Sequence, residues 1–108
     1  EQHRVGIVLV APLEVRLSAR SSREPDVLFV ANARRDRVTD KRIVGAPDLV
    51  VEIVSDDSVR RDRVVKRDEY AAAGVREYWI LDCRPTRQRE EFLVLDEAGR
   101  FREVDVDE

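Results

Sequence analysis

Apolar, β-branched runs recur along the chain, and turn formers such as Gly, Pro and Ser separate them. Such runs are typical of strands. Residues 13–17 alternate apolar and charged side chains, as a half-buried strand does. Residues 18–24 are polar and predict a turn, and residues 31–46 predict a long charged connection. The strands expected from this pattern are residues 5–10, 13–17, 25–30, 48–54, 77–82, 91–95 and 101–106.

One segment has helical signals at both ends. Residues 55–58 read Ser-Asp-Asp-Ser and favour a helix start, and Gly74 is placed where a helix usually ends. We therefore expect a helix over residues 59–73. Its predicted inner face comprises Val59, Val64, Val65, Tyr70 and the alanines 71–73.

This order of elements predicts a single α+β (mixed α/β) domain over residues 1–108, with one main helix and a C-terminal hairpin. The early strands have non-helical connections and should form an antiparallel meander. The helix can act as a crossover, which allows parallel pairing between residues 48–54 and 77–82. If a helix upstream of the sheet is missing, the other face of the sheet is left bare.

Composition limits the classes of function. The chain has 108 residues, of which 40% are charged, and its formal net charge is −3. It therefore lacks a global basic field, and DNA binding must rest on local arrangement. The arginines of residues 31–46 fit either a solvated loop or a loop that contacts phosphate. With one cysteine, no apolar signal sequence and no membrane-length apolar run, the default expectation is a cytoplasmic protein without a membrane anchor.

Glu52 is the anomaly of the chain, because it interrupts the apolar run of residues 48–54. A buried carboxylate needs a partner, a metal ion or a shifted pKa. Asp48 lies four residues away on the same strand, a separation of ~13 Å that prevents both from holding one ion. Asp26 lies on the preceding apolar strand, and antiparallel pairing can place it about 5 Å from Glu52. Asp26 and Glu52 are therefore the predicted metal pair, with Mg²⁺ or Mn²⁺ as the expected ion.

Lys66 is expected about two turns into the helix that follows Glu52, on the same helical face as Tyr70. If that face covers the carboxylates, the Lys66 ammonium can reach the nucleophilic water or the scissile phosphate. The predicted chemistry is metal-assisted phosphodiester hydrolysis, with Asp26, Glu52 and Lys66 as catalytic residues.

Each of these residues also has a plain structural interpretation. Asp26 could cap a turn after Pro25, Glu52 could lie on a solvated strand face, and Lys66 could be a surface residue. Spacing alone does not decide between these interpretations and the catalytic one.

The central part of the chain resembles the Uma-type restriction endonuclease family, a branch of the PD-(D/E)XK nucleases. Two blocks, residues 45–55 and 74–82, carry most of the resemblance. Pro25-Asp26 matches an upstream aspartate strand, and the resemblance covers the chain from about Gly6 onward. The matching stretches are GAPDLVVEIVS at 45–55, RD at 61–62, Lys66, and YAAAGVREYWILD at 70–82.

The resemblance implies divalent-metal-dependent cleavage of DNA. It assigns the metal acids to Asp26 and Glu52, the catalytic lysine to Lys66, and supporting roles to Asp48 and Tyr70. The superfamily's usual lysine position, two residues after the acid, is Val54 here, and Lys66 would restore that charge from the helix. The family usually begins with a helix that carries a further acid, and this chain begins after it. The alternatives left open are a non-catalytic interaction module with the nuclease fold, and a homodimer.

Overall fold

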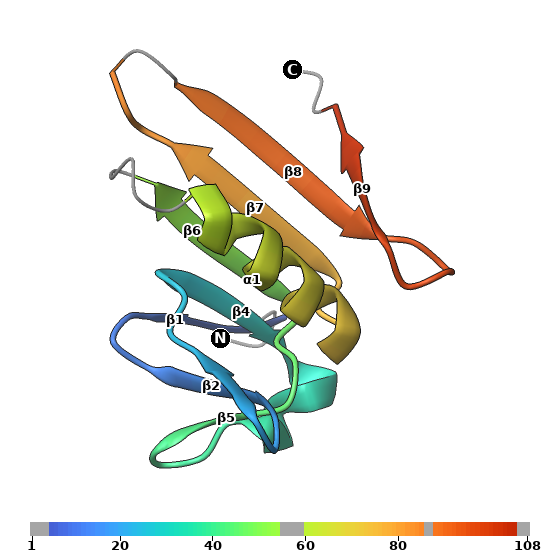
Figure 1. Ribbon diagram of the computed structural model, residues 1–108. Helices are drawn as coiled ribbons and strands as arrows, with labels where there is room; N and C mark the ends of the chain where they lie inside the picture. The colour runs from blue at the N-terminus through green and yellow to red at the C-terminus, as the bar shows by residue number, and fades with distance from the viewer. Residues whose placement is uncertain (1–4, 55–59, 86–87, 106–108) are drawn as a thin grey trace.

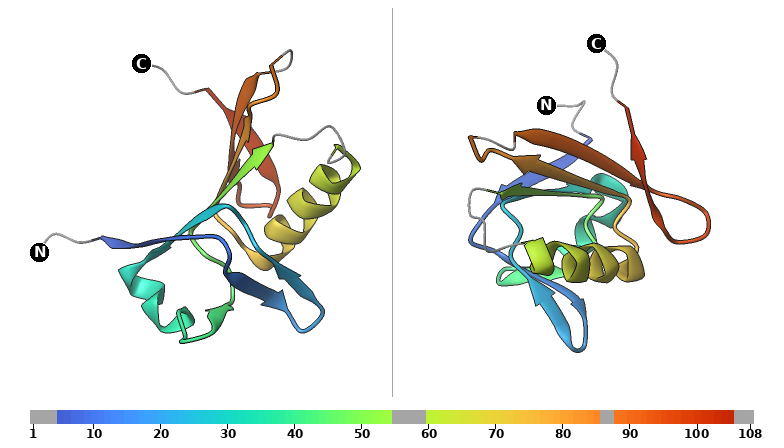
Figure 2. Two further views of the ribbon diagram at one scale, coloured as in Figure 1. Left: turned by 90° about the vertical axis from the view of Figure 1, so that its left-hand side faces the viewer. Right: turned by 45° about the horizontal axis from the view of Figure 1, so that its top comes forward.

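The chain forms a six-stranded sheet with one α-helix and a small second sheet on the same face (Figures 1 and 2). The structure is a computed structural model, and it describes residues 5–54, 60–85 and 88–105. Side chains are described from residue 63 onward in the helix. The elements are β1 Gly6–Val10, β2 Glu14–Ser18, β3 Ser21–Arg23, β4 Val27–Ala31, the 3₁₀ helix η1 Asn32–Arg37, β5 Arg42–Val44, β6 Leu49–Val54, α1 Arg60–Ala73, β7 Glu77–Asp82, β8 Arg89–Leu95 and β9 Phe101–Val104.

The main sheet is mixed, as the sequence predicts. Its strand order is β1-β4-β6-β7-β8-β9. All neighbouring strands pair antiparallel except β6 and β7, which are parallel and joined by α1. The crossover helix and the C-terminal hairpin of β8 and β9 are therefore confirmed.

The prediction of a simple antiparallel meander was wrong for β2. This strand leaves the main sheet and joins β3 and β5 in a second, three-stranded sheet. β3 lies in the predicted turn, and η1 and β5 lie in the predicted long connection. The physical reason is burial: fully buried Val15 of β2 packs with Leu28 and Val30 of β4, so the small sheet covers that part of the main sheet.

The helix ends where the sequence predicts. Gly74 has a φ of 90°, and the N–H of Val75 donates to the Tyr70 carbonyl at 3.0 Å, as in a glycine-terminated helix. The predicted inner face was wrong for Val64 and Val65, which are 63% and 45% exposed. At about 100° per residue, Val64 lies about 120° and Val65 about 140° around the helix from buried Tyr70. The predicted capping residues 55–58 and Val59 lie outside the described residues.

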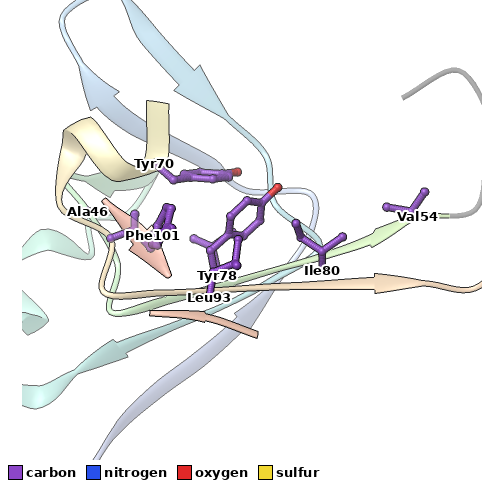
Figure 3. Packing of buried hydrophobic residues seen from close by; sticks show 9 residues of the cluster. Ala46, Val54, Tyr70, Tyr78, Ile80, Leu93 and Phe101 are labelled. Carbon is purple, nitrogen blue, oxygen red and sulfur yellow. The ribbon is translucent and has the colours of Figure 1, made fainter. Parts of the chain in front are cut away.

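Two apolar clusters form the core. One lies between α1 and the sheet, where Tyr70 meets Tyr78 edge-to-face with ring centroids 5.0 Å apart. Figure 3 shows the hydroxyls of Tyr70 and Tyr78 pointing toward the end of the sheet where Ile80 and Val54 lie. The other cluster lies under the small sheet and is formed by Val15, Leu28, Val30 and Ile43.

The opposite face of the main sheet has no helix or strand over it in the described part of the chain (Figure 2). Trp79 and Phe92 meet edge-to-face there, 5.3 Å apart. The large exposed apolar side chains on this face are Val8, Val10, Ile53, Val94 and Val104.

No helix in the described ranges has the length and apolar character needed to span a membrane.

Candidate active site

Glu52 is a buried carboxylate in the middle of the sheet, with 8% of the residue exposed. It occupies β6 on the face that α1 covers, beside Ile80 of β7. The Tyr70 hydroxyl donates to Glu52 Oε2 at 2.7 Å, and Lys66 Nζ lies 3.4 Å from Oε1. One helix therefore supplies a separate partner to each oxygen of this carboxylate.

The Glu52 environment makes the charged carboxylate less favourable than it is in water. Burial raises the pKa of Glu52 above its usual value, and the nearby charge of Asp26 adds to the rise. The hydrogen bond from Tyr70 and the charge of Lys66 oppose the rise without cancelling it. A carboxylate with an unfavourable charge is a functional-site candidate, because a bound cation would compensate for it.

Asp26 lies next to Glu52. The ladder of β4 and β6 ends at the pair of Val27 and Val51, one residue from both Asp26 and Glu52. The charge of Asp26 acts on Glu52, so the two carboxylates are near each other. Asp26 Oδ2 accepts a hydrogen bond from the Ile53 backbone N–H at 2.7 Å. The structure thus places Asp26 near Glu52 and ties its side chain to the neighbouring strand, and their role as a metal pair stays a prediction.

Lys66 reaches Glu52 because it lies four residues before Tyr70, about 40° around the helix. Its side chain is 21% exposed, so the ammonium is sheltered but accessible. The predicted alignment of Lys66 with Tyr70 is therefore present, and both residues contact the same carboxylate.

Asp48 is engaged elsewhere. Its Oδ1 accepts from Arg34 Nε at 2.7 Å, and its Oδ2 accepts from the Ala31 N–H at 2.6 Å. Burial would raise the pKa of Asp48, but the hydrogen bonds from Arg34 and Ala31 and the charge of Arg76 outweigh burial and lower it. The contacts place Asp48 at the opposite end of β6 from Val54, and its supporting role stays a prediction.

Two residues beside Lys66 were missed by the sequence analysis. Arg23 of β3 forms an ion pair with Glu69 of α1, with Nε and Oε1 2.6 Å apart. Arg23 also lines a cleft of about 470 Å³ with Glu14, Ser22, Glu24 and Lys66. Helical spacing could have placed Glu69 near Lys66, but a three-residue strand gives no periodic signal that would bring Arg23 here.

The donor set suits a hard divalent cation. Carboxylate oxygens are the ligands that Mg²⁺ and Mn²⁺ prefer, and the unfavourable charge on Glu52 fits a position that a cation would occupy. Within the described ranges, no three side chains of His, Cys, Asp or Glu cluster as a metal-binding group. The candidate ligands from this part of the protein are therefore the two carboxylates of Asp26 and Glu52.

The sequence matches the family model of Uma2, described as "Putative restriction endonuclease", over residues 1–108. The chain belongs to the Uma2 family. Among solved structures, it is similar to the crystal structure of a "putative nuclease belonging to DUF820" from Anabaena variabilis. That likeness has a TM-score of 0.60 and 21% sequence identity, and it shows a shared fold.

The comparison covers 89% of this Uma2 chain and 62% of the Anabaena variabilis chain. The chain therefore spans less than two thirds of that neighbour. No curated protein matches the sequence.

Proposed function

We propose that this Uma2 chain carries the catalytic centre of a divalent-metal-dependent endonuclease that hydrolyses DNA phosphodiester bonds. The observation that supports the proposal most strongly is Glu52. It is a buried carboxylate near the charge of Asp26, with Lys66 and Tyr70 on its two oxygens. Family membership in Uma2 supports the same class of activity.

Asp26 and Glu52 would hold the cation, which is Mg²⁺ or Mn²⁺ on ligand chemistry. When bound, such an ion lowers the pKa of water and offsets negative charge on a phosphate. The other tasks fall to the side chains of the chain itself.

Tyr70 positions Glu52. Its hydroxyl is fully buried and donates to Oε2, which fixes the carboxylate plane and leaves Oε1 toward Lys66. Because burial and Glu52 raise the pKa of Tyr70, the phenol stays a neutral donor and orients the carboxylate without losing its own proton.

Lys66 supplies the positive charge. An ammonium at 3.4 Å from Glu52 can stabilise the additional negative charge of a phosphate in the transition state, or orient the attacking water. Val54 stands at the strand position two residues after Glu52, where the sequence provides no cation. Lys66 brings the charge to the same carboxylate from the helix instead.

Metal binding and cleavage test this proposal together. Titration with Mn²⁺ should reveal a site that is lost in Glu52→Ala, and a supercoiled plasmid should be nicked by wild type with Mg²⁺ but not by that variant. Arg100→Ala, in the turn between β8 and β9, serves as a matched surface control with unchanged activity. If Mn²⁺ binding survives Glu52→Ala, the assignment of the site is wrong.

The second candidate function is a non-catalytic interaction module that retains the nuclease fold. The bare apolar face of the main sheet, with Ile53 47% and Val8 63% exposed, is the observation that favours it. Absence of both Mn²⁺ binding and nicking in wild type would support this candidate. A homodimer through that face would appear as a doubled mass in solution.

A further inference from the structure

The cleft beside Lys66 is the feature that the proposed chemistry does not use. It lies where β3 approaches α1 and has a volume of about 470 Å³. A single segment delivers both Arg23 and Asp26 to this region, because only Glu24 and Pro25 separate them. Lys66 lines the cleft and also contacts Glu52, so the cleft opens next to the candidate catalytic carboxylate.

We propose that Arg23 and Lys66 form a binding subsite for a second backbone phosphate, adjacent to the scissile one, on the same nucleic-acid strand. This inference rests on the proposed function and adds that the cleft binds the backbone phosphate next to the cleaved one. Two cations supplied by different elements, a strand and a helix, line its walls. Contacts from Arg and Lys to backbone phosphates fix the position of a protein along a nucleic-acid strand.

The Arg23 guanidinium is positioned for this task. Glu69 Oε1 accepts from Arg23 Nε at 2.6 Å, which orients the planar guanidinium at the cleft wall. The Arg23 side chain is 23% exposed, so the fork is accessible from the cleft. Arginine suits phosphate because its donors match two phosphate oxygens at once.

The surrounding charge limits where a phosphate can lie. Glu14 and Glu24 also line the cleft, and Glu69 adjoins it. Glu14 is itself neutralised by Arg42, at 3.0 Å. A phosphate would therefore be repelled from most of the cleft wall and attracted to the side that holds Arg23 and Lys66.

A simpler interpretation is that Arg23 only ties β3 to α1 through Glu69. The two interpretations differ in what removal of each partner does. If Arg23 only links β3 to α1, replacing Arg23 or Glu69 lowers the stability of the fold by the same amount and leaves DNA affinity unchanged. If Arg23 binds a phosphate, DNA affinity falls when Arg23 is replaced but not when Glu69 is replaced.

The test measures binding of a short DNA duplex by fluorescence anisotropy, in Ca²⁺ and over a series of salt concentrations. Arg23→Gln should weaken binding about tenfold and reduce the dependence of log K on log salt by about one phosphate contact. Arg23→Lys should keep the salt dependence. Glu69→Gln keeps an oxygen acceptor for Arg23 and removes a charge that repels phosphate, so it should not weaken binding. Arg100→Ala should leave both quantities as in wild type, and Mn²⁺ affinity should not change in Arg23→Gln.

Equal weakening in Glu69→Gln and Arg23→Gln, or an unchanged salt dependence in Arg23→Gln, would overturn the subsite. Absence of DNA binding by wild type would overturn it as well. Thermal unfolding of each variant shows whether it is folded. If Arg23→Gln does not fold, the comparison of Arg23→Lys with wild type still tests the subsite. The two proposals can fail separately. A wild type that cleaves with no effect of Arg23→Gln refutes only the subsite, whereas the expected salt effect without cleavage refutes only the nuclease.

Discussion

Asp26 and Asp48 occupy equivalent places at opposite ends of the β4–β6 pair. Each follows a buried proline, and each accepts a hydrogen bond from a backbone N–H on the other strand. Asp26 receives that of Ile53 at 2.7 Å, and Asp48 that of Ala31 at 2.6 Å. The two Pro-Asp pairs thus link β4 and β6 at both ends of their antiparallel ladder. Glu52 lies near the Asp26 end.

This equivalence makes Asp48→Asn a matched control for Asp26→Asn. Both changes weaken a hydrogen bond between the strands, and we expect each to lower the free energy of unfolding, Asp26→Asn by about 1 kcal/mol. Asp48→Asn should cost more, about 1–3 kcal/mol, because it leaves Arg34 without its carboxylate. Only Asp26→Asn should reduce Mn²⁺ affinity, which isothermal titration measures directly. Equal loss of Mn²⁺ affinity in the two variants would restore Asp48 to the metal site.

Tyr70→Phe tests how Glu52 is held. The ring should keep its edge contact with Tyr78, so the fold should survive with a loss of about 1–2 kcal/mol for the missing hydrogen bond. Mn²⁺ affinity should fall about 10–100-fold, because the carboxylate loses the donor that orients it. Metal titration and thermal unfolding separate the two effects. An unchanged Mn²⁺ affinity would reduce Tyr70 to a packing residue.

The site could be predicted from the sequence because it depends on simple periodicities. The antiparallel ladder of β4 and β6 ends one residue from Asp26 and Glu52, and helical spacing places Lys66 and Tyr70 on one face of α1. Both rules act over a few residues within regular elements. The distance between the two carboxylates, expected at about 4–6 Å if they share one ion, stays a prediction.

The small sheet could not be predicted for the opposite reason. β3 and β5 have three residues each, too few to show alternation, and β5 pairs with β2, a strand distant in sequence. The exposed Val64 and Val65 show the same limit, since hydrophobic character alone did not indicate which side of α1 faces the sheet. Consequently Arg23, which the small sheet brings to Lys66, was not found from the sequence.

Glu52→Gln should stabilise the metal-free protein. Burial and Asp26 make the charged form of Glu52 unfavourable, as its raised pKa indicates, and a neutral amide of the same shape can still accept from Tyr70. We expect the free energy of unfolding at neutral pH to rise by about 0.5–2 kcal/mol in the presence of EDTA, with loss of Mn²⁺ binding. A lower stability would mean that the Lys66 ion pair outweighs the cost of burying the charge.

Lys66→Ala should separate catalysis from metal binding. Removing the ammonium should lower the nicking rate about 10²–10³-fold, the usual cost of a lost transition-state contact. Mn²⁺ affinity should be equal or higher, since a positive charge 3.4 Å from a metal-ligand carboxylate competes with the ion. Lys41→Ala, an exposed lysine before β5, is the control. Equal nicking by Lys66→Ala and wild type would remove Lys66 from the mechanism.

Asp82, at the end of β7, should control stability in acid. The side chain of Arg84 donates to both carboxylate oxygens, at 2.8 and 2.6 Å, and its backbone N–H adds a further hydrogen bond. Together they lower the pKa of Asp82 to about 2 against the opposing effect of burial. An unfolded aspartate titrates near ~3.9, so the unfolded chain binds more protons between these values, and stability must fall as pH drops from about 4 to about 2. Asp82→Asn and Arg84→Gln should both lower stability at neutral pH and flatten this decline, as followed by urea unfolding at pH 2–5. A decline that stays as steep in both variants would assign the acid sensitivity to other carboxylates.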